Sequence, residues 1–247
     1  MSNPLPDIDV FYEDADLLVV NKPPGLLAVP DRYDKTLPNL WDLLRQRYQL
    51  PELTNPHRLD RYTSGVMIFT KHSQAYRRLT AQFRDRLIRK EYLAICHGTP
   101  VGQSITLPVG ERADRPGLAR IDLHNGKTAE THIAVKEAFR QHSLLTIIIT
   151  TGRLHQIRVH LQAIGHPLVG DADYGGAPLY LSALKPNYKP KPNEPERPLM
   201  TRPALHASAI TLSDPPRTFC APLPDDFEVA LRYLRRFAAR RDPVTQT

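Results

Sequence analysis

The sequence predicts an α+β protein with a large mixed or antiparallel β-sheet flanked by helices. Segments with strand character outnumber helical ones, and no strict alternation of strand and helix occurs along the chain. The composition, with 41% hydrophobic and 24% charged residues, is that of a globular domain. Neither an internal repeat nor a linker divides the 247 residues, so we expect a single catalytic domain over residues 1–247.

The strands are predicted from apolar and β-branched runs. Residues 9–21 form two strands around a turn at 13–16, and the continuously apolar run 17–20 is expected to be central in the sheet. A buried strand is expected at 66–70. Further strands are expected at 91–96, 104–109, 127–139, 144–150 and 205–212.

The helices are predicted from apolar residues at helical spacing. They are expected at 37–48, 73–86, about 155–164, and from 225 onward. Ser73 is the expected cap of the second helix, whose apolar stripe consists of Ala75, Leu79 and Phe83. In the third helix the apolar face predicts that Arg158 points away from the core.

Residues 177–203 are rich in proline and lysine and are not expected to form a regular element. We interpret this segment as a long mobile loop.

The charge favours a polyanionic partner such as RNA, because the net charge is +7 and the pI is near 9.5. Arginines and lysines gather at 77–90 and at 232–241, although each group is equally compatible with a solvated helix face. No apolar run could cross a membrane, and no signal peptide is recognisable. Two cysteines are too few for a disulfide framework or a cysteine zinc site. We therefore expect a cytoplasmic protein with reduced thiols.

The string HRLDRYTSG at residues 57–65 places one acid, Asp60, between two arginines and directly before a turn and a buried strand. The guanidiniums of Arg58 and Arg61 would keep this carboxylate ionised, so that it can act as a nucleophile or a base. The alternative is a turn aspartate that caps a backbone amide or forms a weak surface ion pair.

A second string, GRLHQIRVHL, covers residues 152–161. Gly152 allows a tight turn from strand into helix, so Arg153 is expected at a strand end, where clefts often form. Its guanidinium could hold a carboxylate ionised, or it could bind backbone carbonyls. A zinc site at His155 and His160 is disfavoured, because helical zinc ligands are four residues apart and no acid lies between these two histidines.

Two further strings are RKEYLA at 89–94 and NKPPGL at 21–26. Tyr92 lies in a predicted strand, where cross-strand packing competes with a role as an aromatic platform for an extruded base. The prolines and glycine of the second string fix a rigid loop from which Lys22 could reach phosphate.

Together these strings resemble the RluA-type pseudouridine synthases, which isomerise uridine to pseudouridine in structured RNA. The resemblance runs from about residue 9 to 227 and includes LHA at 205–207 and APLPDDF at 221–227. It implies the pseudouridine synthase fold, a catalytic Asp60, an active-site Tyr92, an Arg153 that pairs with Asp60, and an Arg58 that helps to expel the uridine. Tyr62 stands where relatives often have Asp, and we expect no S4 RNA-binding domain, because the residues before residue 9 leave no room for one.

The resemblance also implies the partners. We expect a structured RNA, an rRNA or tRNA stem-loop, with no cofactor, no metal and no membrane, and a monomer by default. The expected RNA-binding residues are Arg58, Arg61, Lys22, Arg77, Arg84, Lys90 and Arg158. The sequence does not name the target uridine.

Two alternatives from other classes stay open at this point. The first is an RNA-binding module with an inactive site, against which the intact Asp60, Tyr92 and Arg153 argue. The second is a hydrolase that uses Asp60 and His57 on a small nucleotide or sugar, which would not need the arginine-rich helices. A P-loop or dinucleotide enzyme is disfavoured, because neither glycine motif occurs.

Overall fold

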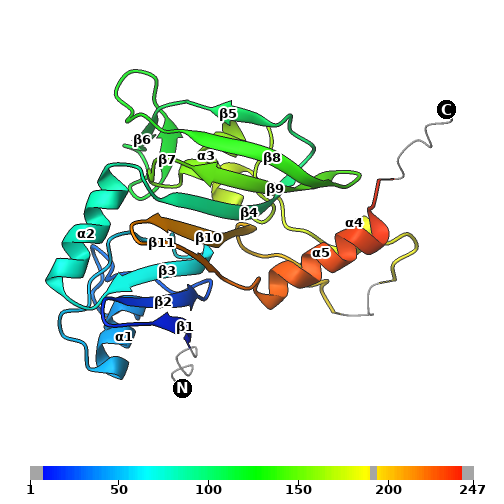
Figure 1. Cartoon of the computed structure of the whole chain (residues 1–247). Coiled ribbons are helices and arrows are strands. Elements are labelled where there is room, and N and C mark those ends of the chain that lie inside the picture. Colours follow the sequence, from blue (N-terminus) through cyan, green and yellow to red (C-terminus); the bar gives the residue numbers. More distant parts are fainter. Residues whose placement is uncertain (1–7, 190–193, 241–247) are drawn as a thin grey trace, which may run out of the picture. The chain divides into compact units, whose positions relative to one another are not determined.

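The computed structural model describes residues 8–189 and 194–240, and every structural statement concerns these residues. They form eleven strands, five α-helices and one 3-10 helix. The main sheet has nine strands and contains both parallel and antiparallel pairs (Figure 1). The predicted α+β class with a large mixed sheet is confirmed.

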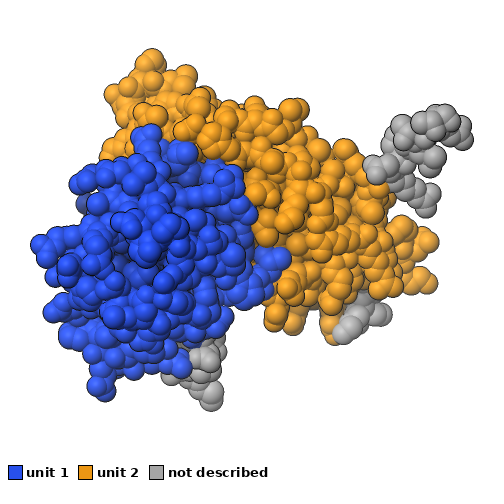
Figure 2. Space-filling model, viewed as in Figure 1, with its two compact units in different colours: residues 1–92, 148–151, 205–223 blue, residues 93–147, 152–204, 224–247 orange. Residues whose placement is uncertain are grey.

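The chain divides into two compact units, each built from separate segments (Figure 2). Unit 1 consists of residues 1–92, 148–151 and 205–223. Unit 2 consists of residues 93–147, 152–204 and 224–247. The expectation of a single domain stays a prediction.

The sheet of unit 1 begins with three antiparallel strands, β1 (Asp9–Glu13), β2 (Leu17–Lys22) and β3 (Ser64–Thr70). β10 (Leu205–Ser213) continues in parallel beside β3 and pairs through a hairpin with β11 (Pro216–Cys220), a strand that the sequence did not predict.

The glycine of the HRLDRYTSG string, Gly65, is required where strands β3 and β10 approach each other. It has a φ of +117°, and a Cβ there would lie 2.2 Å from the carbonyl oxygen of Ala207 on β10. Only glycine allows the two strands to approach this closely. The parallel pairing of β3 with β10 at this point fixes the start of β3, directly after the Asp60 loop.

Two helices follow in unit 1, α1 (Leu40–Tyr48) and α2 (Ser73–Arg84). The predicted cap at Ser73 is wrong, because His72 is the cap and its side chain accepts a hydrogen bond from the amide of Ala75. Ala75 and Leu79 are buried as expected.

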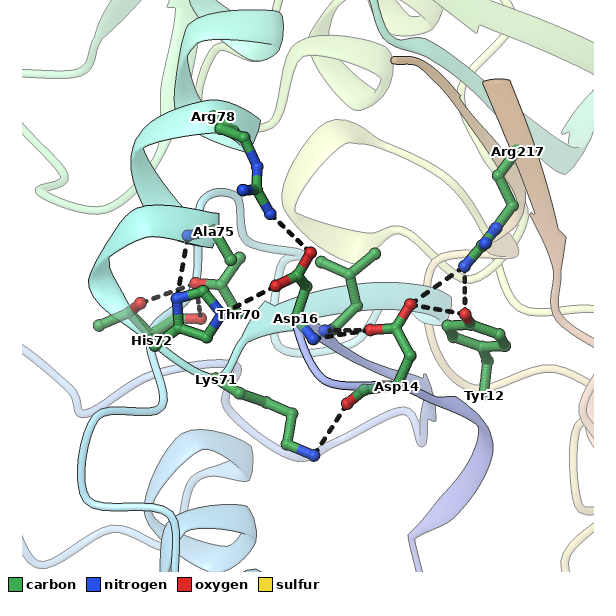
Figure 3. Close-up of polar contacts among 11 residues, drawn as sticks. Tyr12, Asp14, Asp16, Thr70, Lys71, His72, Ala75, Arg78 and Arg217 are labelled. Carbon is green, nitrogen blue, oxygen red and sulfur yellow. Dashed lines mark hydrogen bonds and ion pairs between the residues drawn. The ribbon is translucent and has the colours of Figure 1, made fainter. Parts of the chain in front are cut away.

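A polar cluster fastens α2 to the turn between β1 and β2 (Figure 3). Asp16 binds His72 at 2.8 Å and Arg78 at 2.5 Å, while Asp14 accepts hydrogen bonds from Tyr12 and Arg217. Four of these side chains, Asp14, Asp16, Arg78 and Arg217, border a cavity of about 230 Å³. Leu17 pairs with Thr70, so the cluster lies at the end of β3 that is about 20 Å from the Asp60 end.

In unit 2 the strands follow the order β4, β9, β8, β5, and β6 and β7 form a separate pair. The strands are β4 (Arg89–His97, whose first residues belong to unit 1), β5 (Gln103–Ile105), β6 (Val109–Glu111), β7 (Ala119–Ile121), β8 (Thr131–Ala138) and β9 (His142–Ile149). The helical elements are α3 (Gln156–Ala163), η1 (Ala172–Tyr174), α4 (Leu181–Leu184) and α5 (Asp225–Phe237).

Helix α3 is more deeply buried than its apolar spacing predicts. Every residue from Gln156 to Leu161 is buried, including Arg158, which is 5% exposed. The expectation that Arg158 points away from the core is wrong, because the partly polar face of this helix is buried against acidic residues rather than left in solvent.

The segment 177–203 is fastened at both ends where the structure describes it. The amide of Leu199 donates to the carbonyl of Leu179, and the amide of Ser182 donates to the carboxylate of Glu196. The short helix α4 lies within the segment. Residues 190–193 lie outside the described residues, and the expected mobility of the loop stays a prediction.

Candidate active site

The Asp60 loop leads directly into β3. Leu59 and Thr63 are buried, Asp60 is partly buried, and Arg58 and Arg61 are exposed. The amide of Thr63 donates to the carbonyl of Asp60 at 3.1 Å and closes a turn. The backbone on both sides of Asp60 is therefore held by core side chains and by the turn.

His57 fixes the entrance of this loop. Its Nε2 accepts a hydrogen bond from the amide of Ile68 on β3 at 3.0 Å, and its ring stacks on Phe83 of α2 with centroids 5.0 Å apart. Desolvation, reinforced by the charge of Lys90, lowers the pKa of His57 from 6.5 to about 3. His57 is therefore a neutral acceptor that ties the loop to the sheet. Sequence reasoning considered it only as a hydrolytic residue; no pattern in the sequence pointed to this backbone contact.

Lys22 fixes the exit of the loop. It is fully buried, and its Nζ donates to the carbonyls of Pro23, Leu26 and Arg61 at 2.7–3.0 Å. An ammonium has three protons, and three backbone oxygens accept them here. This geometry does not support the expected contact of Lys22 with RNA phosphate, because the buried ammonium holds the backbone of residue 61 instead.

Tyr92 lies near Asp60 within the same unit. It is 8% exposed, and its pKa is raised, first by burial and then by the negative charge of Asp60. The phenol is therefore neutral, and its buried ring lies close enough to Asp60 for the charge of the carboxylate to act on it. The structure brings these two predicted site residues together.

Arg153 lies in unit 2, between the end of β9 and the start of α3. Its Nε donates to the carbonyl of Thr128 at 3.0 Å, and its amide donates to Gln156 Oε1 at 3.1 Å. The strand-to-helix position that the sequence predicted is confirmed. The pairing of Arg153 with Asp60, which belongs to unit 1, stays a prediction.

Arg158 follows Arg153 in the same sequence string and belongs to a buried polar cluster. It binds Asp171 through two hydrogen bonds of 2.7 and 2.6 Å, binds Asp173 at 2.8 Å, and packs over the ring of Tyr174. Asp171 is fully buried. This placement does not support the expected RNA contact of Arg158, because its guanidinium is enclosed by protein.

The two histidines of the same string have different partners. His155 bonds Arg158 and the hydroxyl of Tyr174, whereas His160 bonds Thr131 and the carbonyl of Leu107. The two rings therefore hold α3 to two different sets of neighbouring residues.

The remaining expected RNA-binding residues lie on or near α2. Arg77 is exposed, Arg84 is paired with its neighbour Asp85, and the Nζ of Lys90 lies 3.3 Å from the carbonyl oxygen of Thr151. Arg84 has a partner that a phosphate would have to replace.

A family model for RNA pseudouridylate synthases matches residues 16–163, which include Asp60, Tyr92 and Arg153. The chain belongs to the RNA pseudouridine synthase family. It is an enzyme that isomerises uridine in RNA to pseudouridine, and the expected family and activity are confirmed. The match spans more than half of the chain, from β2 to the end of α3.

Curated relatives agree with this membership. Ribosomal large subunit pseudouridine synthase D of Pseudomonas aeruginosa is 36% identical over 248 residues, covering 93% of this chain and 72% of the relative. Dual-specificity RNA pseudouridine synthase RluA of Vibrio vulnificus is 38% identical over 177 residues, covering 68% of this chain and 70% of the relative.

Solved structures support the fold. Human RNA Pseudouridylate Synthase Domain Containing 4 matches with a TM-score of 0.70 and 23% identity, covering 92% of this chain and 93% of that one. Human RNA Pseudouridylate Synthase Domain Containing 1 matches with a TM-score of 0.67 and 27% identity, covering 91% and 86%. Among the described residues, no helix is long and apolar enough to span a membrane.

Proposed function

We propose that this pseudouridine synthase acts on a structured ribosomal RNA in the cytoplasm, as a monomer, with Asp60 as its catalytic carboxylate. The observation that carries the assignment is the Asp60 loop itself. One partly exposed carboxylate stands between two backbone anchors, Lys22 and His57, and beside the buried ring of Tyr92. A functional group held in this way is preorganised.

The reaction requires a carboxylate near C1′ of the ribose. The N1–C1′ bond breaks, the uracil rotates, a C5–C1′ bond forms, C5 loses its proton and N1 gains one, so that product and substrate have the same atoms. Asp60 acts at the sugar as nucleophile or base, as carboxylates do in glycoside chemistry. The residues assigned to this chemistry need no cofactor.

The other residues position the substrate. Tyr92 stacks on the uracil of a uridine flipped out of the RNA, because its ring is fixed in the core and close to Asp60. Arg153 pairs with Asp60 and keeps it ionised in a water-poor site. Arg58, which is exposed beside Asp60, fills the space that the uridine leaves.

Phosphate contacts come from the exposed cations Arg61, Arg77 and Arg84 and from the partly buried Lys90. Ribosomal RNA is favoured as the substrate, because the relative aligned over 93% of this chain bears a ribosomal large subunit name. A tRNA stem-loop is the second candidate, favoured by the dual-specificity relative.

The hydrolase alternative required His57 to act together with Asp60, and the contacts of His57 argue against this role. His57 Nε2 is bound to the Ile68 amide, and the lowered pKa keeps the ring neutral, so this nitrogen is not placed to take a proton from water at a substrate.

The Asp60→Asn variant tests the assignment. We expect turnover on unmodified large-subunit rRNA transcript to fall at least about a thousandfold, because the reaction loses its carboxylate, while RNA binding stays within a few fold. Asp9→Asn, a substitution at an exposed aspartate at the start of β1, is the matched control. Full activity of Asp60→Asn would exclude Asp60 as the catalytic group.

The substrate is tested by mapping pseudouridine in total RNA from cells with and without the gene. Loss of the modification at one or a few rRNA uridines is the expected result. A loss confined to tRNA would replace the ribosomal assignment by the second candidate.

A further inference from the structure

Two exposed tyrosines stand in loops of unit 1, and one of them belongs to the Asp60 loop. Tyr62, two residues after Asp60, is 47% exposed, and Tyr33, in the loop between β2 and α1, is 79% exposed. Single exposed aromatic rings are common on protein surfaces, so the groups around them decide whether they can bind a ligand.

Each ring has a guanidinium over its face. Arg61 lies 5.6 Å from the centroid of the Tyr62 ring, and Arg32 lies 5.7 Å from the centroid of the Tyr33 ring. Arginine and aromatic side chains in alternation are the combination that binds nucleic acid, through phosphate contacts and base stacking.

Both pairs lie in unit 1, and hydrogen bonds connect the loop of the first pair to the chain segment that leads to the second. The Nε of Arg61 donates to the carbonyl of Gly25 at 3.0 Å, and the amide of Gly25 donates to the carbonyl of Arg61 at 2.9 Å. These bonds join the Asp60 loop to the segment that leads to Tyr33. The pKa of Asp31 is lowered, first by the amides of Asp34 and Tyr33 and further by nearby charges that include Arg61.

The loop that carries Tyr33 is itself ordered by local bonds. Asp31 Oδ1 accepts hydrogen bonds from the amides of Tyr33 at 2.8 Å and Asp34 at 3.0 Å. A ring on a hydrogen-bonded turn loses less conformational entropy on binding than a ring on an unstructured loop.

We propose that Tyr33 and Tyr62 form a stacking surface for unpaired nucleobases of the RNA next to the target uridine. The proposal rests on the assignment of Asp60 and adds the region that holds the neighbouring nucleotides while one uridine is extruded. Sequence-specific recognition of RNA works largely on such unstacked bases in loops, which aromatic side chains bind by their faces. Because stacking tolerates any base, this surface contributes affinity and places the loop, whereas its sequence preference is weak.

The test measures the dissociation constant and the turnover separately, on unmodified large-subunit rRNA transcript. The variants are Tyr33→Ala, Tyr62→Ala and the ring-preserving Tyr33→Phe and Tyr62→Phe. The matched control is Tyr76→Ala on α2, which removes a tyrosine that is 36% exposed near the other end of β3.

We expect each alanine variant of the two site tyrosines to raise the dissociation constant about tenfold, with kcat at saturating RNA within about threefold of the unaltered chain. The phenylalanine variants and Tyr76→Ala should bind within about twofold of it. The slope of binding against salt should not change, because no charge is lost.

A dissociation constant unchanged in both alanine variants would overturn the stacking surface, and so would an equal loss in the phenylalanine variants. Absence of pseudouridine formation by the unaltered chain, on transcript and on cellular RNA, would instead overturn the proposed function. The two failures are distinguishable because binding is measured directly.

Discussion

At the residue scale, the chemistry of this enzyme depends on how one carboxylate is held. The string at residues 57–65 identified Asp60 from the sequence, because its arginines, turn and following strand are local features. The partners of the loop are not local. Lys22 lies 39 residues from Arg61, and His57 binds an amide 11 residues away, so no spacing rule reveals either contact. The sequence therefore predicted the reactive group, whereas only the fold shows what positions it.

The neutrality of His57 gives a pH-dependent prediction. Its pKa in the folded state is about 3, below 6.5, so its contribution to stability is complete above pH 6.5 and is lost as the pH falls toward 3. We expect His57→Leu to lower the free energy of unfolding at pH 7.5 by about 1–3 kcal/mol, because the Ile68 amide loses its acceptor. Between pH 7.5 and 5.0 this difference should shrink by at most about 2 kcal/mol.

Urea unfolding of both proteins at the two pH values checks this expectation. The other histidines are present in both proteins and cancel in the comparison. An unchanged difference between pH 7.5 and 5.0 would mean that His57 is not held neutral by the fold.

At the element scale, the sequence predicted where most helices and strands lie and was less successful at their ends and faces. Helix α2 was predicted from its apolar stripe, but the cap is His72, because Asp16 orients its ring. Helix α3 was predicted with one apolar face, yet every residue from Gln156 to Leu161 is buried, because Asp171 from a later segment neutralises Arg158. Each error has the same cause: a charged partner far away in the sequence changes what a polar side chain does.

The cap of α2 is tested by two adjacent substitutions. We expect His72→Ala to lower the free energy of unfolding by about 1 kcal/mol, because the Ala75 amide loses its acceptor. Ser73→Ala should change it by less than about 0.5 kcal/mol, since alanine suits a helix and Ser73 is not the cap. Thermal or urea unfolding measures both, and a larger effect at Ser73 would restore the cap predicted from the sequence.

The cluster around Arg158 offers a comparison within one ion-pair network. Asp171→Ala should lower the free energy of unfolding by about 3–5 kcal/mol, because the buried guanidinium of Arg158 loses its bidentate partner. Asp173 binds the same guanidinium, but its side chain is half-exposed. We therefore expect Asp173→Ala to lower the free energy of unfolding by less than about 1 kcal/mol. Equal losses, measured by urea unfolding, would show that burial does not distinguish the two aspartates.

At the scale of the whole molecule, composition and motif order predicted an α+β protein of this family with a large sheet. They did not predict the order of the strands in that sheet. The parallel contact of β3 with β10 joins residues about 140 apart, and it depends on a glycine whose close approach to Ala207 is invisible in the sequence. Likewise, the excess of positive charge indicated RNA, yet it did not show which cations are available. Lys22 and Arg158 are enclosed, whereas Arg77 is exposed.

This difference in availability predicts how RNA binding responds to salt. Each cation that contacts a phosphate releases counterions, so its loss should reduce the slope of log K against log salt by about 1. We expect this reduction for Arg77→Ala. Arg84→Ala should reduce the slope less, because Arg84 must exchange Asp85 for the phosphate.

Binding of unmodified rRNA transcript at salt concentrations from roughly 50 to 200 mM, where counterion release is resolved, measures both slopes. Arg235→Ala on α5 is the control, because Arg235 is already paired with Glu137 through two hydrogen bonds. If Arg77→Ala leaves the slope unchanged while Arg235→Ala lowers it, the RNA lies against α5 rather than α2, and the phosphate contacts assigned to the surface around Arg77 are wrong.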